Sequence, residues 1–315
     1  MAINSKNISE WLKNLQDNIC ASLELADGKA KFETDNWKRK EGGGGRTRII
    51  RNGNVIEKGG VLFSAVYGEA PDFIFSEKEH SLISIKKNSK KKAQFFATGV
   101  SIVIHPLNPM VPIIHMNIRY FEMTPPQIPK GKVIKWLGGG IDLTPHYINV
   151  EDAKYFHSQL KKVCDKHHPD YYSDFKKWAD DYFYIKHRKE SRGIGGIFFD
   201  RLAENKKMTF DKNLNFWKET GELFAPVYTE LIKRNAKKEF TQQNKNWQVL
   251  RRGRYVEFNL IYDKGTKFGL ETNGRVESIL MSLPRTAGWE YDFKPEKNSE
   301  EEKTLKTLNK ITKWV

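Results

Sequence analysis

Hydrophobic and polar residues alternate along two parts of the chain, and elsewhere apolar residues recur every three or four positions. A period of two predicts β-strands at residues 61–67, 99–105, 113–123 and 133–143. Residues 124–131 contain three prolines, which cannot join a central ladder, so they are expected to form the loop of a long hairpin between the last two strands. Beyond residue 250 the pattern predicts three further strands, at residues 254–263, 267–271 and 276–283.

Helical spacing predicts helices at both ends of the chain and through residues 149–250. The first helix begins near Ser9, its predicted N-cap. Its apolar face carries Ile8, Trp11, Leu12, Leu15 and Ile19. Further helices are expected around residues 153–163, 175–185, 214–231 and 300–311. Strands on both sides of a helical middle predict a single α+β domain over residues 1–315, with a large antiparallel sheet covered by helices and residues 1–36 as an N-terminal helix and arm.

Three polar side chains share one face of the predicted strand at residues 113–123. Side chains of a strand alternate between its two faces, so His115, Asn117 and Arg119 lie together while the residues between them face a core. An imidazole, an amide and a guanidinium on one rigid face suit an anionic ligand. A solvated outer face of an antiparallel sheet is the alternative, and this strand alone does not decide between them. The strand at residues 99–105 likewise places Ser101 and His105 on one face.

Three glycine-rich segments interrupt these patterns. Residues 42–45 are four glycines, which we interpret as a hinge, a lid or a place where backbone meets a ligand. Residues 138–140 are three glycines inside a predicted strand, which indicates that something approaches the backbone closely. Residues 192–196 are expected to join a helix to an apolar segment. They act either as a helix stop or as a place where Arg192 and bare amides reach an anion.

Other polar residues are candidates for the same site. Asp142 closely follows the three glycines and is either a turn cap or a carboxylate directed at a ligand. Alternation in residues 254–263 places Glu257, Asn259 and Asp263 on one face. This second polar-faced strand favours a polar floor within the sheet. Residues 273–275 (Asn-Gly-Arg) predict a hairpin turn with an arginine at the sheet edge.

Composition narrows the classes of protein. The chain is 38% hydrophobic and 12% aromatic, which is typical of a folded globular protein. Its net charge of +15 favours an anionic partner, either nucleic acid, a membrane surface or a polyanionic small molecule. Lysine and arginine are scattered rather than gathered in one stripe, which speaks against nucleic-acid binding. No apolar run approaches the roughly 20 residues of a membrane span.

The cysteines and the N-terminus indicate the compartment. Cys20 and Cys164 fall within amphipathic helical patterns and are expected to pack in a core, which fits a reducing compartment. The first residues have no apolar signal-peptide core and no arginine before Arg39. We therefore expect a cytoplasmic protein rather than a mitochondrial one.

No standard catalytic or cofactor motif is present, including Gly-x-Ser-x-Gly, His-Glu-x-x-His, Cys-x-x-Cys and the dinucleotide glycine fingerprint. His105, His157 and His187 lie on three different predicted elements, so their spacing gives no metal signature. They could converge in space on a transition metal, as in a metal-dependent oxygenase. Ordinary hydrogen-bonded or capping histidines are the alternative.

Several long motifs nevertheless resemble one known family. They include His115-x-Asn-x-Arg-Tyr-Phe-Glu122, Trp136-x-Gly-Gly-Gly-x-Asp-Leu-Thr-Pro145, Arg192-Gly-Ile-Gly-Gly-Ile-Phe-Phe-Asp200 and Arg251-Arg-Gly-Arg-Tyr-Val-Glu-Phe-Asn259. Together they resemble oxygen-dependent coproporphyrinogen III oxidase from about residue 37 to the C-terminus. The resemblance implies that O2 oxidatively decarboxylates two propionates of coproporphyrinogen III to vinyl groups, giving protoporphyrinogen IX in haem biosynthesis.

The resemblance also implies an architecture, partners and residue roles. It implies an antiparallel sheet sandwiched between helices, a homodimer formed through residues 255–290 and no organic cofactor, and it leaves a divalent-metal requirement open. His115 matches the proposed proton donor. The positions that match substrate contacts are Ser101, Asn117, Ile118, Arg119, Asn273, Gly274 and Arg275. Those that match proposed metal ligands are His105, His157 and His187.

A substrate with four propionates implies binding and catalytic roles for the remaining polar residues. Arg119, Arg192 and Arg275 then become carboxylate clamps, because a guanidinium binds a carboxylate with two parallel hydrogen bonds. The reaction also requires an electron-rich pyrrole, and a carboxylate that accepts the pyrrole N–H proton is the simplest agent. Asp142 and Asp263 are the candidate bases.

Overall fold

The computed structural model describes residues 4–70, 93–124, 133–271 and 274–315. Its centre is a seven-stranded antiparallel sheet with the strand order β1-β2-β3-β4-β5-β6-β9. The strands are β1 (Glu33–Lys38), β2 (Gly43–Arg51), β3 (Ile56–Glu69), β4 (Gln94–Pro106), β5 (Ile113–Thr124), β6 (Ile134–Thr144) and β9 (Gly196–Leu202). A separate short pair joins β7 (Tyr184–Ile185) to β8 (Glu190–Ser191). The four strands predicted before residue 144 are confirmed, as is the pairing of the long hairpin β5–β6.

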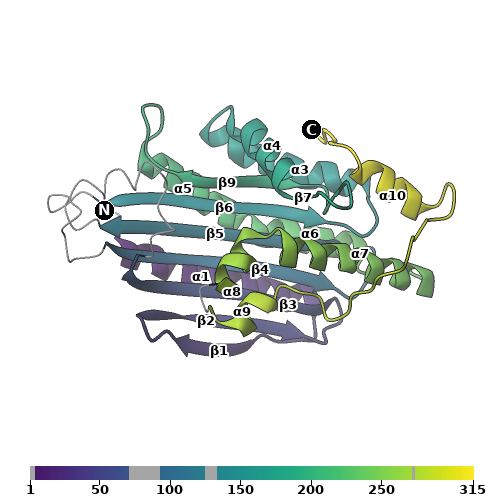
Figure 1. The fold of residues 1–315 in the computed structure, drawn as a ribbon, viewed down its shortest axis with the longest axis horizontal. Coiled ribbons are helices and arrows are strands. Elements are labelled where there is room, and N and C mark those ends of the chain that lie inside the picture. Colours follow the sequence, from purple (N-terminus) through teal and green to yellow (C-terminus); the bar gives the residue numbers. More distant parts are fainter. Residues whose placement is uncertain (1–3, 71–92, 125–132, 272–273) are drawn as a thin grey trace.

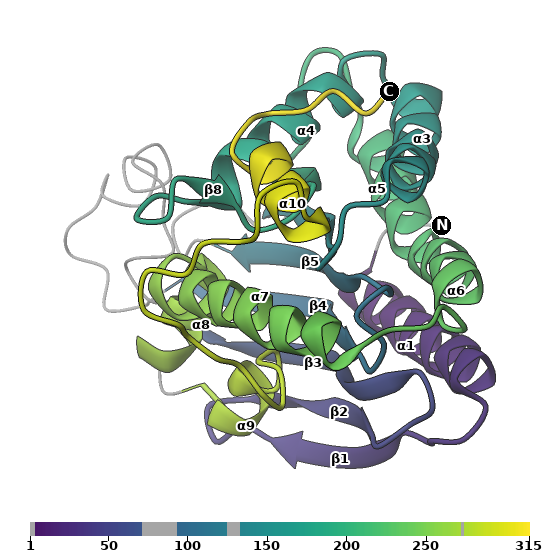
Figure 2. The ribbon, with the colours of Figure 1, turned by 90° about the vertical axis from the view of Figure 1, so that its right-hand side faces the viewer.

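Helices cover both faces of this sheet (Figures 1 and 2), which confirms the predicted α+β sandwich. One face is covered by α1 (Ser5–Asp27), α5 (Phe210–Glu222) and α6 (Phe224–Asn235), with α3 (Val150–His167) packed against α5 and α6. The opposite face carries α7 (Gln242–Ile261), α8 (Lys264–Glu271) and α9 (Val276–Leu280). The chain is completed by α4 (Tyr171–Tyr182) beside β9 and by α10 (Glu300–Leu308). Within the described residues, no helix has the length and apolar character needed to cross a bilayer.

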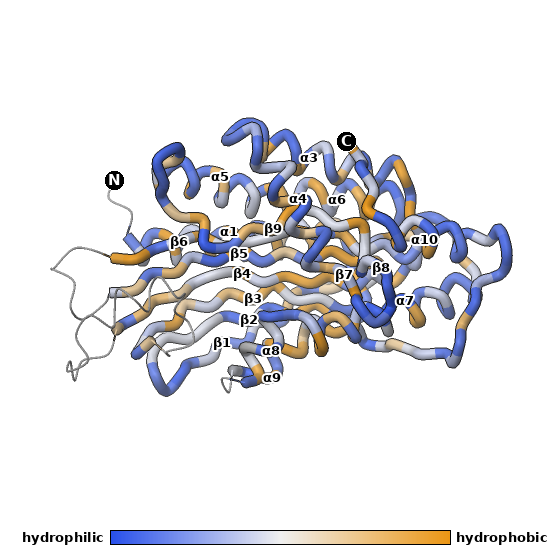
Figure 3. The backbone as a smooth tube through the Cα atoms, turned by 45° about the horizontal axis from the view of Figure 1, so that its top comes forward, coloured by the Kyte–Doolittle hydropathy of each residue, from blue (hydrophilic) through white to orange (hydrophobic). Residues whose placement is uncertain are grey.

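The main core lies between the sheet and the layer of α1, α5 and α6. Met116, Ile118 and Tyr120 of β5 are buried in one cluster with Leu12 of α1 and Phe216 of α5. Figure 3 shows long apolar stretches along the central strands and polar residues along the outer turns. The predicted inward face of β5 is therefore confirmed, and its other face, with His115, points toward the α7 side of the sheet.

The three strands predicted beyond residue 250 are wrong, because these residues lie mostly in α7, α8 and α9. A capping box between Thr241 and Asn244 starts α7. Its buried residues then recur at helical spacing, as at Trp247, Arg251, Tyr255 and Phe258. The end of α7 is rich in residues with strand propensity, but it continues a helix that begins upstream, and burial overrides propensity. The predicted second polar-faced strand is therefore a helix.

Five smaller predictions also need correction. The N-cap of α1 is Asn4 rather than Ser9. The helix expected at residues 214–231 is divided into α5 and α6 at Leu223. Arg192 follows the β7–β8 pair and not a helix, and residues 274–275 lie between two helices rather than two strands. Three of the four glycines at residues 42–45 belong to β2, where Gly45 lies against the ring of Trp37, so they form neither hinge nor lid.

Both cysteines pack as predicted. Cys20 and Cys164 are buried and unbridged, and each belongs to the main core. Burial raises the pKa of both thiols to about 12, so they stay protonated at neutral pH.

Candidate active site

The register of β4, β5 and β6 arranges the α7-facing residues in rows across three strands. The first row is Val103, His115 and Asp142; the second is Ser101, Asn117 and Gly140; the third is Gly99, Arg119 and Gly138. Residues paired across antiparallel strands point to the same side, so these side chains share one face. Glycines flank Arg119 on both sides, and the floor beside it is therefore bare backbone.

Three side chains form a hydrogen-bonded chain from this face into the interior. His115 Nδ1 lies 2.7 Å from Asp142 Oδ1, and Arg192 Nη2 donates to Asp142 Oδ2 at 2.7 Å. Arg192 Nη1 also donates to Asn259 Oδ1 of α7 at 3.0 Å. The exposed fraction of the side chain falls from 21% for His115 to 2% for Asp142 and 2% for Arg192. Only the imidazole meets solvent, and the bond at Nδ1 leaves its Nε2 to exchange a proton with a ligand.

The charges of this chain stabilise one another. Burial acts to raise the pKa of Asp142, but the Arg192 guanidinium and the hydrogen bond from His115 outweigh it and hold that pKa below its ordinary value of 3.8. Burial acts to lower the pKa of Arg192, and the Asp142 carboxylate more than reverses this, so the pKa is raised. Asp142 is therefore ionised at neutral pH, which favours the tautomer of His115 that carries a proton on Nδ1.

Arg119 is fixed on the floor by two acceptors. Its Nη2 donates to Asp200 Oδ1 at 2.7 Å and its Nη1 donates to Asn117 Oδ1 at 2.9 Å. The side chain is 34% exposed, so part of the guanidinium can meet a ligand. A β-carbon on Gly138 would lie 2.8 Å from both Arg119 Nε and Asp200 Oδ1. The close approach predicted at residues 138–140 is thus made by side chains of the protein itself.

Other predicted substrate contacts differ in their access to this face. Ser101 and Asn117 are partly exposed on it. The side chain of Ile118 is buried in the main core, so a ligand could meet only its main chain. Arg192, predicted as a carboxylate clamp, is buried, and its Nη groups bond Asp142 and Asn259.

Asp263, Gly274 and Arg275 do not join the His115 chain by any hydrogen bond in the described part of the protein. Asp263 is the N-cap of α8, where its Oδ2 accepts from the main-chain N of Thr266 at 2.7 Å and its Oδ1 accepts from the Tyr182 hydroxyl at 2.9 Å. Arg275 forms an ion pair with Asp35 of β1, at the opposite edge of the sheet from β9. The main-chain N of Gly274 donates to the carbonyl of residue 269 at 2.7 Å, and Asn273 lies outside the described residues.

The three histidines that match proposed metal ligands have separate partners. They are Ser282 O for His105, Tyr172 Oη and Ile194 O for His157, and Tyr262 Oη and Glu257 for His187. Burial lowers the pKa of His105 and of His157 to about 3, so both rings are neutral. Across residues 4–70, 93–124, 133–271 and 274–315, no group of three or more His, Cys, Asp or Glu side chains could hold a metal ion. The structure therefore does not bring these histidines into one site.

Two parts of the site were not predicted from the sequence. Asp200 reaches Arg119 because the register between β6 and β9 shifts between Leu137 and Gly139, and no local sequence pattern announces such a bulge. The rings around Arg192 come from Phe183 and from the part of α7 that the sequence pattern predicts as a strand. The same pattern identifies Asn259, as part of a strand face.

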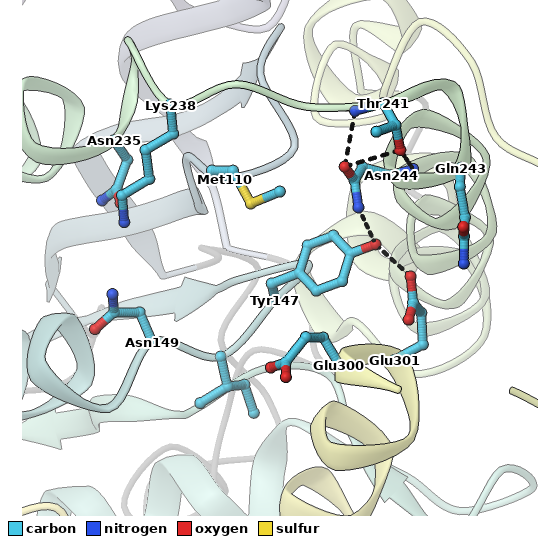
Figure 4. Close-up of a pocket in the computed structure, with 11 residues that line it drawn as sticks. Met110, Tyr147, Asn149, Asn235, Lys238, Thr241, Gln243, Asn244, Glu300 and Glu301 are labelled. Atoms are coloured by element: carbon cyan, nitrogen blue, oxygen red, sulfur yellow. Dashed lines mark hydrogen bonds between the residues drawn. The ribbon is translucent and has the colours of Figure 1, made fainter. Parts of the chain in front are cut away.

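A pocket of about 490 Å³ lies elsewhere in the described part of the chain (Figure 4). Tyr147 crosses it and donates to Glu301 Oε1 at 2.6 Å, while Asn244 Nδ2 donates to the same hydroxyl at 2.9 Å. None of the predicted catalytic or substrate-contacting residues lines this pocket.

Comparison with known proteins places these motifs in one family. The family model described as coproporphyrinogen III oxidase matches residues 7–314. The chain is 48% identical over 307 residues to coproporphyrinogen-III oxidase 1, chloroplastic, of Arabidopsis thaliana, covering 96% of this chain and 78% of the relative. It is 49% identical over 301 residues to the mitochondrial oxygen-dependent coproporphyrinogen-III oxidase of Rattus norvegicus (95% and 66%). It is 43% identical over 337 residues to the oxygen-dependent coproporphyrinogen-III oxidase of Prochlorococcus marinus (98% and 94%). This protein belongs to the coproporphyrinogen III oxidase family.

Proposed function

We propose that this protein is an oxygen-dependent oxidase that converts two propionates of coproporphyrinogen III to vinyl groups, giving protoporphyrinogen IX in haem biosynthesis. One observation carries the proposal beyond family membership. A partly exposed imidazole, backed by the buried Asp142–Arg192 pair, lies on the same strand face as the partly exposed Arg119. That face combines a proton-transfer group with a cation for a propionate.

The stoichiometry explains why a proton donor is needed. Each propionate loses carbon dioxide and the equivalent of a hydride from its β-carbon, which leaves a vinyl group. O2 accepts the hydride equivalent and one proton and becomes hydrogen peroxide, so each half-reaction consumes one proton. We assign delivery of this proton to His115 Nε2, because Nδ1 is bonded to Asp142 and only the imidazole of the chain is exposed.

Binding and base catalysis are divided among different residues. Arg119 offers the free part of its guanidinium to a propionate while Asp200 and Asn117 fix its orientation. Asp142 is too deeply buried to touch the pyrrole N–H, and it acts through His115. The neutral imidazole accepts that proton at Nε2 and then delivers it to the oxygen that becomes hydrogen peroxide, while the pyrrole nitrogen regains a proton from solvent. Arg192 holds Asp142 ionised rather than clamping substrate, and Asp263 serves as the cap of α8.

The homodimer and the compartment are further parts of the proposal. The segment at residues 255–290 exposes several large apolar side chains, namely Leu260, Ile261, Leu270, Val276 and Trp289. A second copy of the chain would cover such a surface. Light scattering on the native protein and on Ile261→Glu tests the dimer, which the variant is expected to weaken. Cell fractionation tests the cytoplasmic location, since the eukaryotic relatives named above are chloroplastic and mitochondrial.

The function is tested by an aerobic assay of metal-stripped protein with coproporphyrinogen III, following vinyl product and hydrogen peroxide. We expect two peroxides for each protoporphyrinogen IX and no product without O2. Absence of product in the stripped enzyme, with recovery on adding a divalent metal, would show that the reaction requires a metal. Absence of product under both conditions would refute the assigned activity.

A further inference from the structure

Arg192 is enclosed by three aromatic rings as well as by its two hydrogen-bond acceptors. Its Cζ lies 4.3 Å from the ring centroid of Phe183, 4.7 Å from that of Tyr255 and 4.6 Å from that of Phe258. All three rings are buried. Phe183 directly follows α4, and the other two rings stand on α7, which covers the site face in Figure 2. Two separate elements thus converge on one guanidinium.

This arrangement fixes a buried charge in position. The negative faces of aromatic rings attract a guanidinium, most strongly where water is excluded. The three rings limit the movement of the guanidinium, while Asp142 and Asn259 each accept a hydrogen bond from one Nη group. Phe183 also lies edge-on to the ring of His115, with 6.3 Å between the centroids, so the enclosure touches both ends of the proton-transfer chain.

Simple core packing is the alternative explanation for these rings. Phe183 and Phe258 belong to a small apolar cluster with Ala179 and Ile185, separate from the main core. Tyr255 packs in a third small cluster with Val103 and Ile113, and its buried hydroxyl lies beside Asn259. Because the Tyr255 ring also lies over the charged guanidinium of Arg192, the attraction between ring and charge adds to packing in explaining its position.

We propose that Phe183, Tyr255, Phe258 and Asn259 are positioning residues for the reaction, because they hold Arg192 where it bonds Asp142, which in turn bonds His115 Nδ1. The inference rests on the proposed function, since it assigns these residues to the turnover step rather than to substrate binding. None of the four touches substrate in this account. Their loss therefore lowers kcat and leaves KM unchanged.

The test compares Tyr255→Leu with Tyr255→Phe. The leucine variant removes the aromatic face and is expected to lower kcat about tenfold with KM within about twofold. The phenylalanine variant keeps that face and removes only the hydroxyl, so it is expected to retain kcat within about twofold. Asn259→Leu, which removes the acceptor for Nη1 at similar volume, is expected to match Tyr255→Leu.

A matched control separates positioning from general destabilisation. Phe199→Leu removes a buried ring from the main core, where Phe199 packs against Phe175 and Phe216, and it is expected to lower the melting temperature without lowering kcat. Wild-type kcat in folded Tyr255→Leu and Asn259→Leu would overturn the inference, as would an equal loss in Tyr255→Phe and Tyr255→Leu. Lack of vinyl product from the wild-type protein would instead refute the proposed function.

Discussion

Replacing Asp142 with asparagine removes one charge from the centre of the site and changes almost nothing else. Asparagine has nearly the same shape, so no cavity is created. Arg192 stays where it is, 2% exposed and bonded to Asn259, but without a counter-charge. His115 loses the carboxylate that holds its Nδ1 proton. The substitution therefore tests stability and catalysis separately.

The expected magnitudes follow from the burial of the pair. Breaking a buried ion pair by removing one partner costs about 3–5 kcal/mol, because an uncompensated charge remains inside. Urea unfolding, followed by tryptophan fluorescence, should show a lower midpoint with an unchanged slope. Steady-state turnover should fall by about 10²–10⁴, the usual contribution of a positioned proton-transfer group. Asp263→Asn is the matched control, with an expected cost of about 1 kcal/mol for a weakened cap and near wild-type turnover.

The pH dependence of stability gives a second measurement of the same group. The pKa of Asp142 is lowered on folding, so its stabilising contribution is complete above the unfolded-state pKa and is lost as pH falls through the folded-state value. The wild-type protein should lose this contribution below about pH 4, whereas Asp142→Asn lacks it at every pH. Wild-type stability and turnover in Asp142→Asn would refute the role of this pair, and wild-type turnover in both aspartate variants would refute carboxylate-assisted proton transfer altogether.

Three other predictions concern individual residues. Arg119→Lys cannot bond Asp200 and Asn117 together and should raise KM by about tenfold to a hundredfold in steady-state assays, with a much smaller change in kcat; an unchanged KM would exclude the clamp. Gly138→Ala forces a β-carbon against Arg119 and Asp200, so its KM should rise in the same direction, and wild-type kinetics would show that the guanidinium position is unimportant. Asp27 accepts hydrogen bonds from the main-chain N atoms of residues 30 and 54–56, which lowers its pKa despite burial. Asp27→Asn should therefore lower the free energy of unfolding in urea by about 1.5–3 kcal/mol while kcat stays constant. Unchanged stability would contradict this.

The sheet could be predicted from the sequence because hydrophobic and polar residues alternate along its central strands. From Ile114 to Tyr120 of β5 every second residue is buried in the main core, and the polar residues between them are site residues. The pairing with β6 follows from a short connection between adjacent strands. The identity of Arg119's acceptor could not be predicted in this way, because Asp200 reaches it through a register shift that depends on the packing of β9.

The failure at α7 has a different physical cause. Residues 254–263 contain aromatic and β-branched residues that alternate with polar ones, and a short window cannot distinguish this pattern from a strand. The deciding signal lies upstream, in the capping box at Thr241 and the buried series from Trp247 to Phe258. In the helical state Asn259 bonds Arg192, whereas Glu257 bonds Arg188 and Trp289 instead. The alternation therefore correctly singled out Asn259 and wrongly grouped it with Glu257.

Strand register explains why the proton-transfer group and the cation that binds a propionate lie on one surface. His115 and Arg119 are four residues apart on β5, so they face the same way and lie about 13 Å apart along the strand. A slip of one residue between β5 and β6 would turn Asp142 to the core face while leaving His115 on the site face. The glycine opposite Arg119 stabilises the correct register for a steric reason, because a larger residue there would collide with the guanidinium. The same glycine that keeps the floor open thus also helps to hold the carboxylate beneath the imidazole.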